Sequence, residues 1–103
     1  MDAQLKKGLL DACVLAVLKK GESYGYKIIS DLKDIIEISE STLYPILKRL
    51  EAGGFLTTRT HPEFVRLRKY YAITRSGLHR LVDYREDWFE MKSIYEKIFD
   101  GGI

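Results

Sequence analysis

The spacing of apolar residues changes period twice along the chain, and this change restricts the fold more than any other feature. Up to residue 52, apolar side chains recur every three or four positions, which is the period of an α-helix. Residues 66–74 follow the two-residue period of a strand, and helical spacing returns over residues 76–99. One alternating stretch between helical segments predicts a mostly helical fold with a small β-hairpin.

The first part of the chain predicts short helices joined by tight turns. The first helix covers about residues 4–19, and Gly21 suits its C-terminal cap. Its predicted buried stripe comprises Leu5, Leu9, Leu10, Cys13, Val14, Val17 and Leu18. The second helix is expected to follow Ser23 as its N-cap. Its apolar stripe is predicted at Tyr26, Ile29, Leu32 and Ile36, with Ile28 and Ile35 beside it.

A third helix is predicted to end at Gly53-Gly54. Ser39, Ser41 and Thr42 are candidate caps. Pro45 conflicts with a helical carbonyl four residues earlier, so we expect regular helix only from about Thr42, with a looser turn before it. Three short helices in this order suggest a helix-turn-helix arrangement.

The hairpin and the last helix complete the expected fold. Residues 55–60 and 66–74 predict two strands, with a turn at residues 61–63 and a loop longer than two residues; Phe64 and Val65 belong either to the tip or to the second strand. Thr74 or Ser76 is expected to cap a helix that runs to about Phe99. That helix is too long for a 75-residue core to cover, so its distal apolar residues need a partner, most simply a second copy of the chain.

Composition excludes several classes of protein. One cysteine in 103 residues makes no disulfide within the chain, and Cys13, His61 and His79 are too few and too scattered for a structural zinc site, so the chain is expected to be intracellular and to need no cofactor or metal. No apolar stretch is long enough to span a bilayer. The segment from Gly21 to Gly25 matches the G-x-S-x-G string of hydrolases, but it follows a helix in a chain far too short for that fold, so we do not expect an enzyme.

Charge is concentrated in the hairpin region. Residues 1–54 are neutral overall, residues 55–75 carry five basic residues against Glu63 alone, and residues 76–103 are net acidic. On a helical wheel the third helix turns Leu43, Ile46, Leu47 and Leu50 inward, and Ser41, Lys48 and Ala52 outward, flanked by Tyr44 and Pro45, with Thr42 and Arg49 further round. Hydroxyls and cations on an outward helix can bind DNA phosphates and base edges. A solvated surface is the alternative.

Several strings then resemble a known family. Tyr24-Gly25-Tyr26, the run from Ser41 to Glu51 (STLYPILKRLE), the run from Arg68 to Thr74 (RKYYAIT) and Gly77 together resemble the PadR family of bacterial transcriptional regulators. The resemblance implies a winged helix-turn-helix whose hairpin is the wing, and a last helix that dimerises. It also implies repression that is often relieved by small aromatic or drug-like ligands. The chain is similar to the short subgroup, some of whose members bind flat ligands between protomers near a tryptophan, as Trp88 is placed here.

These observations together predict two domains and two sets of site residues. Residues 1–75 are expected to form the DNA-binding domain and residues 76–103 the dimerisation helix. The predicted DNA-binding residues are Tyr24, Ser41, Thr42, Tyr44, Lys48, Arg49, Arg59, Arg66, Arg68 and Lys69. The predicted ligand or dimer interface comprises Leu9, Trp88, Phe89, Met91, Tyr95, Ile98 and Phe99.

Some assignments stay open. Tyr44 either contacts DNA or only shapes the first turn of its helix, Tyr24 either binds a phosphate or packs in the core, and Trp88 is either a ligand platform or a dimer residue. The hairpin tip has no glycines, unlike many wings of the family, and Arg85 and Lys92 interrupt the apolar seam of the last helix.

We therefore expect a cytoplasmic homodimer that binds double-stranded operator DNA and responds to an aromatic effector. The alternatives are a dimer that binds aromatic molecules with weak or no DNA binding, and a winged helix that makes only protein contacts.

Overall fold

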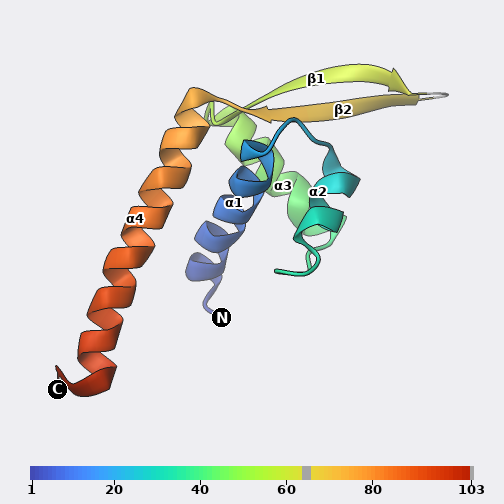
Figure 1. Ribbon diagram of the computed structural model, residues 1–103. Coiled ribbons are helices and arrows are strands. Elements are labelled where there is room, and N and C mark those ends of the chain that lie inside the picture. Colours follow the sequence, from blue (N-terminus) through green and yellow to red (C-terminus); the bar gives the residue numbers. More distant parts are fainter. Residues whose placement is uncertain (64–65, 103) are drawn as a thin grey trace.

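The computed structural model describes residues 1–63 and 66–102. Three helices are followed by an antiparallel hairpin and a long helix that leaves the rest of the molecule (Figure 1). In chain order the elements are α1 (Ala3–Lys19), α2 (Gly25–Leu32), α3 (Glu40–Ala52), β1 (Leu56–Glu63), β2 (Arg66–Ile73) and α4 (Arg75–Lys97), with a terminal π-helical turn at Ile98–Gly102. This is the winged helix-turn-helix architecture with a C-terminal helix that the sequence predicted.

The core lies among the first three helices, which together with the hairpin we call the head. The largest fully buried side chains are Val14, Leu15, Leu18, Ile28, Leu32, Leu43 and Leu47. On α1 the prediction is right for Leu10, Val14 and Leu18, but Leu15 is buried without having been predicted and Leu5 is 53% exposed, because the other helices cover only the C-terminal part of the stripe. The predicted inward side of α3 is confirmed, because Leu43, Ile46, Leu47 and Leu50 are at most 5% exposed. The other side of α3 is therefore left to solvent.

The predicted start of α2 is wrong. The backbone of Ser23 pairs with Tyr71 of β2, with N–O distances of 3.0 and 2.8 Å, and Tyr24 becomes the N-cap. Helix α2 ends at Leu32 and turns Ile28 and Leu32 into the core, whereas Tyr26 and Ile35 are 65% and 77% exposed. The apolar spacing of this segment is helical, as predicted. The contact between Ser23 and Tyr71, however, makes the helix start at Gly25, and this start decides which side chains reach the core.

Helix α3 begins two residues earlier than predicted. Ser39 is the N-cap, and its hydroxyl accepts the Thr42 N–H at 3.3 Å. Pro45 consequently lies inside the helix. Ser41 and Pro45 are both exposed, so water can satisfy the carbonyl that proline leaves without its helical partner. The helix ends where expected, with Gly53 as C-cap and Gly54 at φ = 80°.

The hairpin is longer than predicted. β1 and β2 pair in antiparallel register from Leu56 opposite Ile73 to Glu63 opposite Arg66, so residues 61–63 belong to β1 and not to a turn. The pairing also contradicts the expected loop of more than two residues, and Phe64 and Val65 lie outside the described residues. Pro62 is compatible with this ribbon because the sheet of the described residues has two strands, so each strand has an outer edge on which a proline removes no ladder hydrogen bond.

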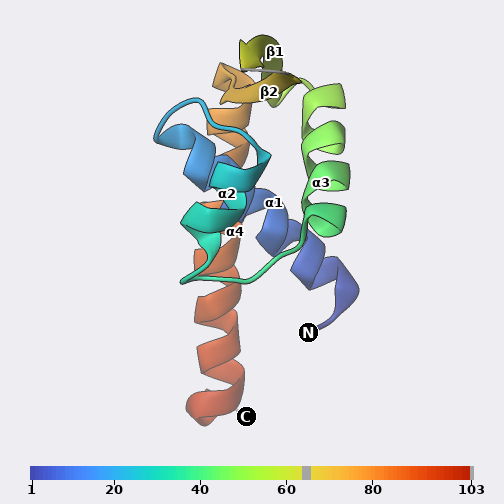
Figure 2. The same cartoon turned by 90° about the vertical axis from the view of Figure 1, so that its right-hand side faces the viewer.

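Helix α4 begins under the hairpin and runs past α1. The Thr74 hydroxyl caps it by accepting the Gly77 N–H at 3.0 Å, as one of the predicted caps. A Cβ on Gly77 would lie 2.3 Å from the Phe55 carbonyl oxygen, so only glycine lets α4 leave the sheet this closely. Figure 2 shows the lower half of α4 extending beyond the head, and the molecule is 61 Å long but only 26 and 20 Å across.

Candidate nucleic-acid interface and the grooves along α4

The outward side of α3 carries polar and basic side chains on a rigid support. Ser41, Thr42, Tyr44, Pro45 and Lys48 are exposed, whereas the opposite side is fixed in the core. The Ser39 hydroxyl lies 2.9 Å from that of Ser41 and 3.2 Å from that of Thr42. The start of α3 therefore presents a cluster of hydroxyls, and Lys48 adds a cation further along the same face.

Tyr44 both packs against the protein and reaches solvent. A Cβ on Gly25 would lie 2.5 Å from the Tyr44 hydroxyl, so the Tyr44 ring sits across the start of α2 in space that glycine leaves. The side chain is nevertheless 45% exposed. A side chain at position 25 would displace the Tyr44 ring. The contact between Gly25 and Tyr44 therefore helps to set how α2 packs against α3.

One face of the hairpin stacks cations on aromatic rings. The Arg68 guanidinium lies 4.1 Å from the Tyr24 ring centroid, and Tyr24 meets Tyr70 edge to face at 5.6 Å. Arg59 lies over Tyr70 at 4.5 Å. Such stacking holds guanidinium groups in place without neutralising their charge. Tyr24 is half-buried and in contact with the hairpin, so it links the wing to the start of α2.

Arg59 also has an acidic partner. Its guanidinium donates to both carboxylate oxygens of Glu22 at 2.8 and 2.6 Å. The hydrogen bond from Arg59 holds the pKa of the exposed Glu22 carboxyl below its usual value. Part of the positive charge at the base of the wing is therefore balanced within the chain.

The other face of the hairpin contacts the C-terminal end of α3. Lys69 lies 3.5 Å from Glu51, whose other carboxylate oxygen accepts a 2.9 Å hydrogen bond from the Thr58 hydroxyl. Tyr71 on this face is buried, whereas Tyr70 on the other face is half-buried. Arg68 and Lys69 therefore lie on opposite faces of the hairpin, and the side chain of Arg66 lies outside the described residues.

Arg49 has an ion-pair partner that the sequence alone does not reveal. Its guanidinium forms an ion pair with Asp11 of α1, whose residue is only 6% exposed. The second oxygen of Asp11 accepts a 3.3 Å hydrogen bond from the Tyr84 hydroxyl of α4. The sequence does hold a signal for this ion pair. Asp11 stands among the apolar residues of α1, and a buried carboxylate requires a partner.

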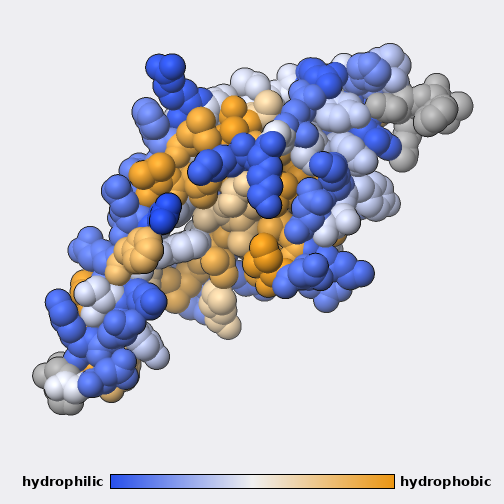
Figure 3. Space-filling model, in the orientation of Figure 1, coloured by the Kyte–Doolittle hydropathy of each residue, from blue (hydrophilic) through white to orange (hydrophobic). Residues whose placement is uncertain are grey.

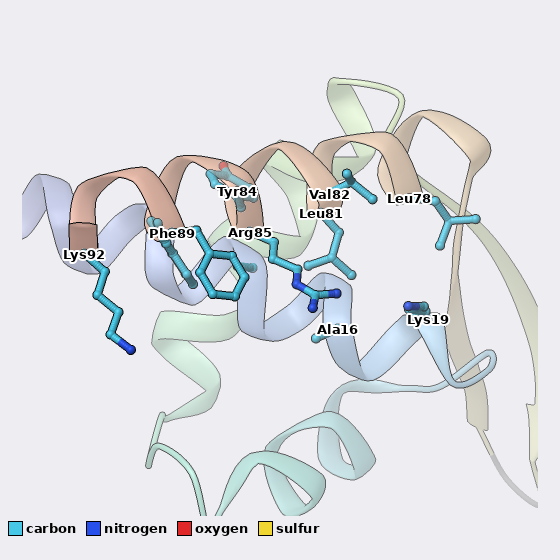
Figure 4. A pocket seen from close by; sticks show the side chains of 11 residues that line it. Ala16, Lys19, Leu78, Leu81, Val82, Tyr84, Arg85, Phe89 and Lys92 are labelled. Atoms are coloured by element: carbon cyan, nitrogen blue, oxygen red, sulfur yellow. The ribbon is translucent and has the colours of Figure 1, made fainter. Parts of the chain in front are cut away.

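A shallow apolar groove runs between α1 and α4. Its volume is about 720 Å³, and its lining residues are Ala12, Ala16, Lys19, Leu78, Leu81, Val82, Tyr84, Arg85, Trp88, Phe89 and Lys92. Figure 4 shows Leu81, Arg85 and Phe89 directed from α4 toward α1. Three cations and no carboxylate contribute to the lining, so we call this surface the basic-rimmed groove.

A second groove lies beyond it, nearer the N-terminus of α1. It has a volume of about 300 Å³ and is lined by Met1, Leu5, Leu9, Trp88, Met91, Lys92 and Tyr95. Trp88 lines both grooves, so it stands where they meet. Beyond it, Tyr95 and Phe99 stack at 4.8 Å while remaining 59% and 68% exposed. Figure 3 shows apolar side chains gathered where α4 passes the head.

The described part of the chain offers neither a membrane span nor a metal site. None of its helices is long and apolar enough to cross a membrane. Residues 1–63 and 66–102 also contain no group of histidine, cysteine and acidic side chains able to hold a metal ion.

Comparison with known proteins identifies one family. The model of the transcriptional regulator PadR-like family matches residues 14–83, which include α2, α3, the hairpin and the first part of α4. The negative transcriptional regulator PadR of Bacillus subtilis is 37% identical over 81 residues, which make up 74% of this chain but only 44% of that protein.

Solved structures of similar proteins share the whole fold. A PadR family transcriptional regulator from Eggerthella lenta is 32% identical, with a TM-score of 0.87 over 95% of this chain and 88% of that chain. A protein from Streptococcus mutans is 43% identical, with a TM-score of 0.80 over 94% and 92%. The Bacillus subtilis PadR crystallised with operator DNA is 30% identical, with a TM-score of 0.70 over 88% and 59%.

Proposed function

Because the chain belongs to the PadR-like family of DNA-binding transcriptional regulators and is not an enzyme, we propose that it is a homodimeric, ligand-responsive repressor. Its action would take place in the cytoplasm, on a pseudo-palindromic operator. The observation that carries this proposal is the division of α3 into a core face that is at most 5% exposed and an outward face of hydroxyls and Lys48.

In the proposed complex α3 enters the major groove. Recognition helices of this kind use their N-terminal residues on base edges, and the hydroxyls of Ser41 and Thr42 stand at that end. Lys48 and the exposed part of Tyr44 contact the DNA from the same face. The crystal structure of the Bacillus subtilis relative with operator DNA supports this use of the fold.

The wing adds contacts to phosphates. The Arg68 guanidinium packs on the Tyr24 ring and lies on the same face of the hairpin as Arg59. Arg66 follows the same strand two residues earlier, and Lys69 approaches the end of α3. Phosphate contacts release counterions, so operator affinity should fall steeply with salt.

Residues 76–103 are proposed to form the dimerisation domain and residues 1–75 the DNA-binding domain. A partner chain laid along the basic-rimmed groove would cover Phe89, and its own distal α4 would bring acidic residues toward Arg85 and Lys92. The second groove and the distal apolar residues Leu9, Met91, Tyr95, Ile98 and Phe99 would extend this interface. Two α3 helices would then face successive major grooves, roughly 34–36 Å apart.

An aromatic effector is proposed to bind beside Trp88. The indole stands where the two grooves meet, with the Tyr84 ring 6.0 Å away. A ligand there would regulate DNA binding only if it favoured one separation of the two heads over another.

The test is selection of bound duplexes from a random DNA pool, followed by titration of the selected duplex. Lys48→Ala should weaken binding about tenfold, because a phosphate or base contact contributes about 1–3 kcal/mol. The control is Lys97→Ala in the last turn of α4, far from the hairpin in Figure 1. If the Lys48→Ala variant and the unaltered chain bound the duplex with equal affinity, α3 would not be part of the DNA interface.

A second candidate function is capture of aromatic molecules without DNA binding. The basic-rimmed groove favours it, because apolar residues line most of its surface and Trp88 is half-buried. Quenching of Trp88 fluorescence by flat aromatic compounds, together with no enrichment of any duplex in the selection, would favour this function over repression.

A further inference from the structure

A buried carboxylate joins two helices of the head to α4. Asp11 of α1 is 6% exposed, and it binds Arg49 of α3 through one oxygen and the Tyr84 hydroxyl of α4 through the other. A charge in such a position destabilises the fold unless it is paired, so both partners are held to it. Asp11 is therefore a polar connection between the DNA-reading helix and the C-terminal helix.

Arg49 is placed differently from its neighbour Lys48. Lys48 is exposed on the outward face of α3, whereas the Arg49 side chain turns to Asp11 and keeps 40% exposure. Its charge is balanced by a carboxylate of the same chain. Arg49 is thus suited to set the angle of α3 against α1, and less suited to neutralise a DNA phosphate.

Tyr84 extends the connection to the surface of α4. Its ring lies 6.0 Å from Trp88, lines the basic-rimmed groove and is covered by the Arg80 guanidinium at 5.0 Å. Whatever changes the position of α4 against α1 must move the Tyr84 ring, and its hydroxyl is bonded to Asp11.

We propose that Asp11 is a positioning residue, which transmits the position of α4 to the recognition helix through Tyr84 and Arg49. The inference rests on the proposed function, since it presupposes that α3 reads DNA and that α4 carries the dimer and effector surfaces. In this arrangement Arg49 affects operator binding through Asp11 and makes no direct contact with DNA.

A double-mutant cycle on the full chain tests the link to α3. Asp11→Asn and Arg49→Gln should each weaken binding of the selected duplex by about fivefold or more, and the double variant should bind no more weakly than the worse single one. The salt dependence should stay unchanged by Arg49→Gln, whereas loss of a phosphate contact would lower the slope of log K against log salt by about 0.9. A lowered slope, additive losses, or full affinity of Asp11→Asn would overturn the proposal.

The link to α4 is tested with the single tryptophan of the chain. Tyr84→Phe removes only the hydroxyl that donates to Asp11 and keeps the ring beside Trp88. Saturating operator should change Trp88 emission in the unaltered chain, and Tyr84→Phe should abolish most of that change while the protein still binds the duplex. An equal emission change in both proteins, or none in the unaltered chain, contradicts the proposal.

These measurements separate the two hypotheses and do not depend on one variant. If the unaltered chain enriches no duplex from the pool, the proposed function itself fails. If it binds DNA and the cycle or the Trp88 signal behaves otherwise, only the role of Asp11 fails. If Asp11→Asn does not fold, as circular dichroism would reveal, Tyr84→Phe and the salt slope of Arg49→Gln decide the question.

Discussion

Helices α3 and α4 are both amphipathic in sequence, yet only α3 is covered by its own chain. Four apolar side chains of α3 are at most 5% exposed. In α4, whose residues are all described, Gly77 alone is buried, and Phe89, Ile94 and Tyr95 are 50–60% exposed. The difference teaches that the head buries the apolar side of α3 by itself, whereas α4 leaves apolar side chains exposed, and we propose that a second copy of the chain covers them.

The same contrast appears in the charges. The head neutralises cations near its base, with Arg49 on Asp11, Arg59 on Glu22 and Lys69 near Glu51. The basic-rimmed groove has Lys19, Arg85 and Lys92 in its lining and no carboxylate. Lys92 lies 3.9 Å from Glu96 of the same helix, so only part of the groove's positive charge is expected to be balanced from outside the protomer, either by an acidic stretch of a partner helix or by an effector.

The largest effect should come from the core of α3. Leu47→Ala is expected to lower the free energy of unfolding by about 2–5 kcal/mol, because it leaves a cavity at a side chain with no exposure. The loss should be the same at every protein concentration, since the cavity lies within one head. Chemical denaturation followed by circular dichroism measures it.

The matched variant on α4 is Ile94→Ala, at a residue that is 50% exposed. Its effect should appear as a change in the concentration dependence of unfolding, because in the proposed dimer this side chain contacts the partner chain. If Ile94→Ala destabilised the chain independently of concentration, the proposed contrast between α3 and α4 would be wrong.

The next effect concerns dimerisation. Phe89→Glu removes an aromatic ring from the proposed interface and should raise the dimer dissociation constant about a hundredfold, since loss of a central aromatic side chain at an interface costs about 2–4 kcal/mol. Sedimentation equilibrium measures it. Asp83→Lys is the control, because Asp83 is exposed on α4 and lines neither groove. An unchanged dissociation constant of the Phe89→Glu variant would show that the dimer interface lies elsewhere.

The smallest effect is a pH dependence of the head. Burial raises the pKa of the Tyr71 phenol above its ordinary value of 10.0. The folded state therefore favours the neutral phenol; this contribution to stability is complete below the unfolded pKa and is lost as pH rises through the folded pKa. Tyr71→Phe should lose less stability than the unaltered chain between neutral pH and about pH 11.

Denaturant titrations at the two pH values check this expectation. Tyr26→Phe serves as control, because Tyr26 is 65% exposed on α2. A similar alkaline loss in the Tyr71→Phe variant and the unaltered chain would show that ionisation of Tyr71 is not coupled to folding.

Much of the fold could be predicted because it depends on local periodicity. Spacing alone predicts the buried side of α3, most of that of α1 and the presence of the two strands, and residue type predicts Thr74 as a cap of α4. The errors lie where a distant contact decided the outcome. Ser23 pairs with Tyr71 of the hairpin and so cannot cap α2, and the same contact sets which side of α2 is buried.

The candidate site divides in the same way. The outward face of α3 was predicted correctly as a surface, since 100° per residue fixes the sides of a helix once its core residues are known. Direct DNA contact by the proposed residues remains a prediction. Glu22 lies 37 positions from Arg59 and Asp11 lies 38 positions from Arg49, so no local pattern pairs these cations with their partners.

The order of the elements, their type and the family follow from the sequence by itself, because hydrophobic period, caps and short motifs act over a few neighbouring residues. Only the tertiary structure decided that Asp11 gathers Arg49 and Tyr84, that Tyr44 lies on Gly25 and that α4 leaves an apolar groove beside α1. These features arise when helices far apart in the chain pack together, since burial of a charge or a ring depends on what the other helices bring to the same place.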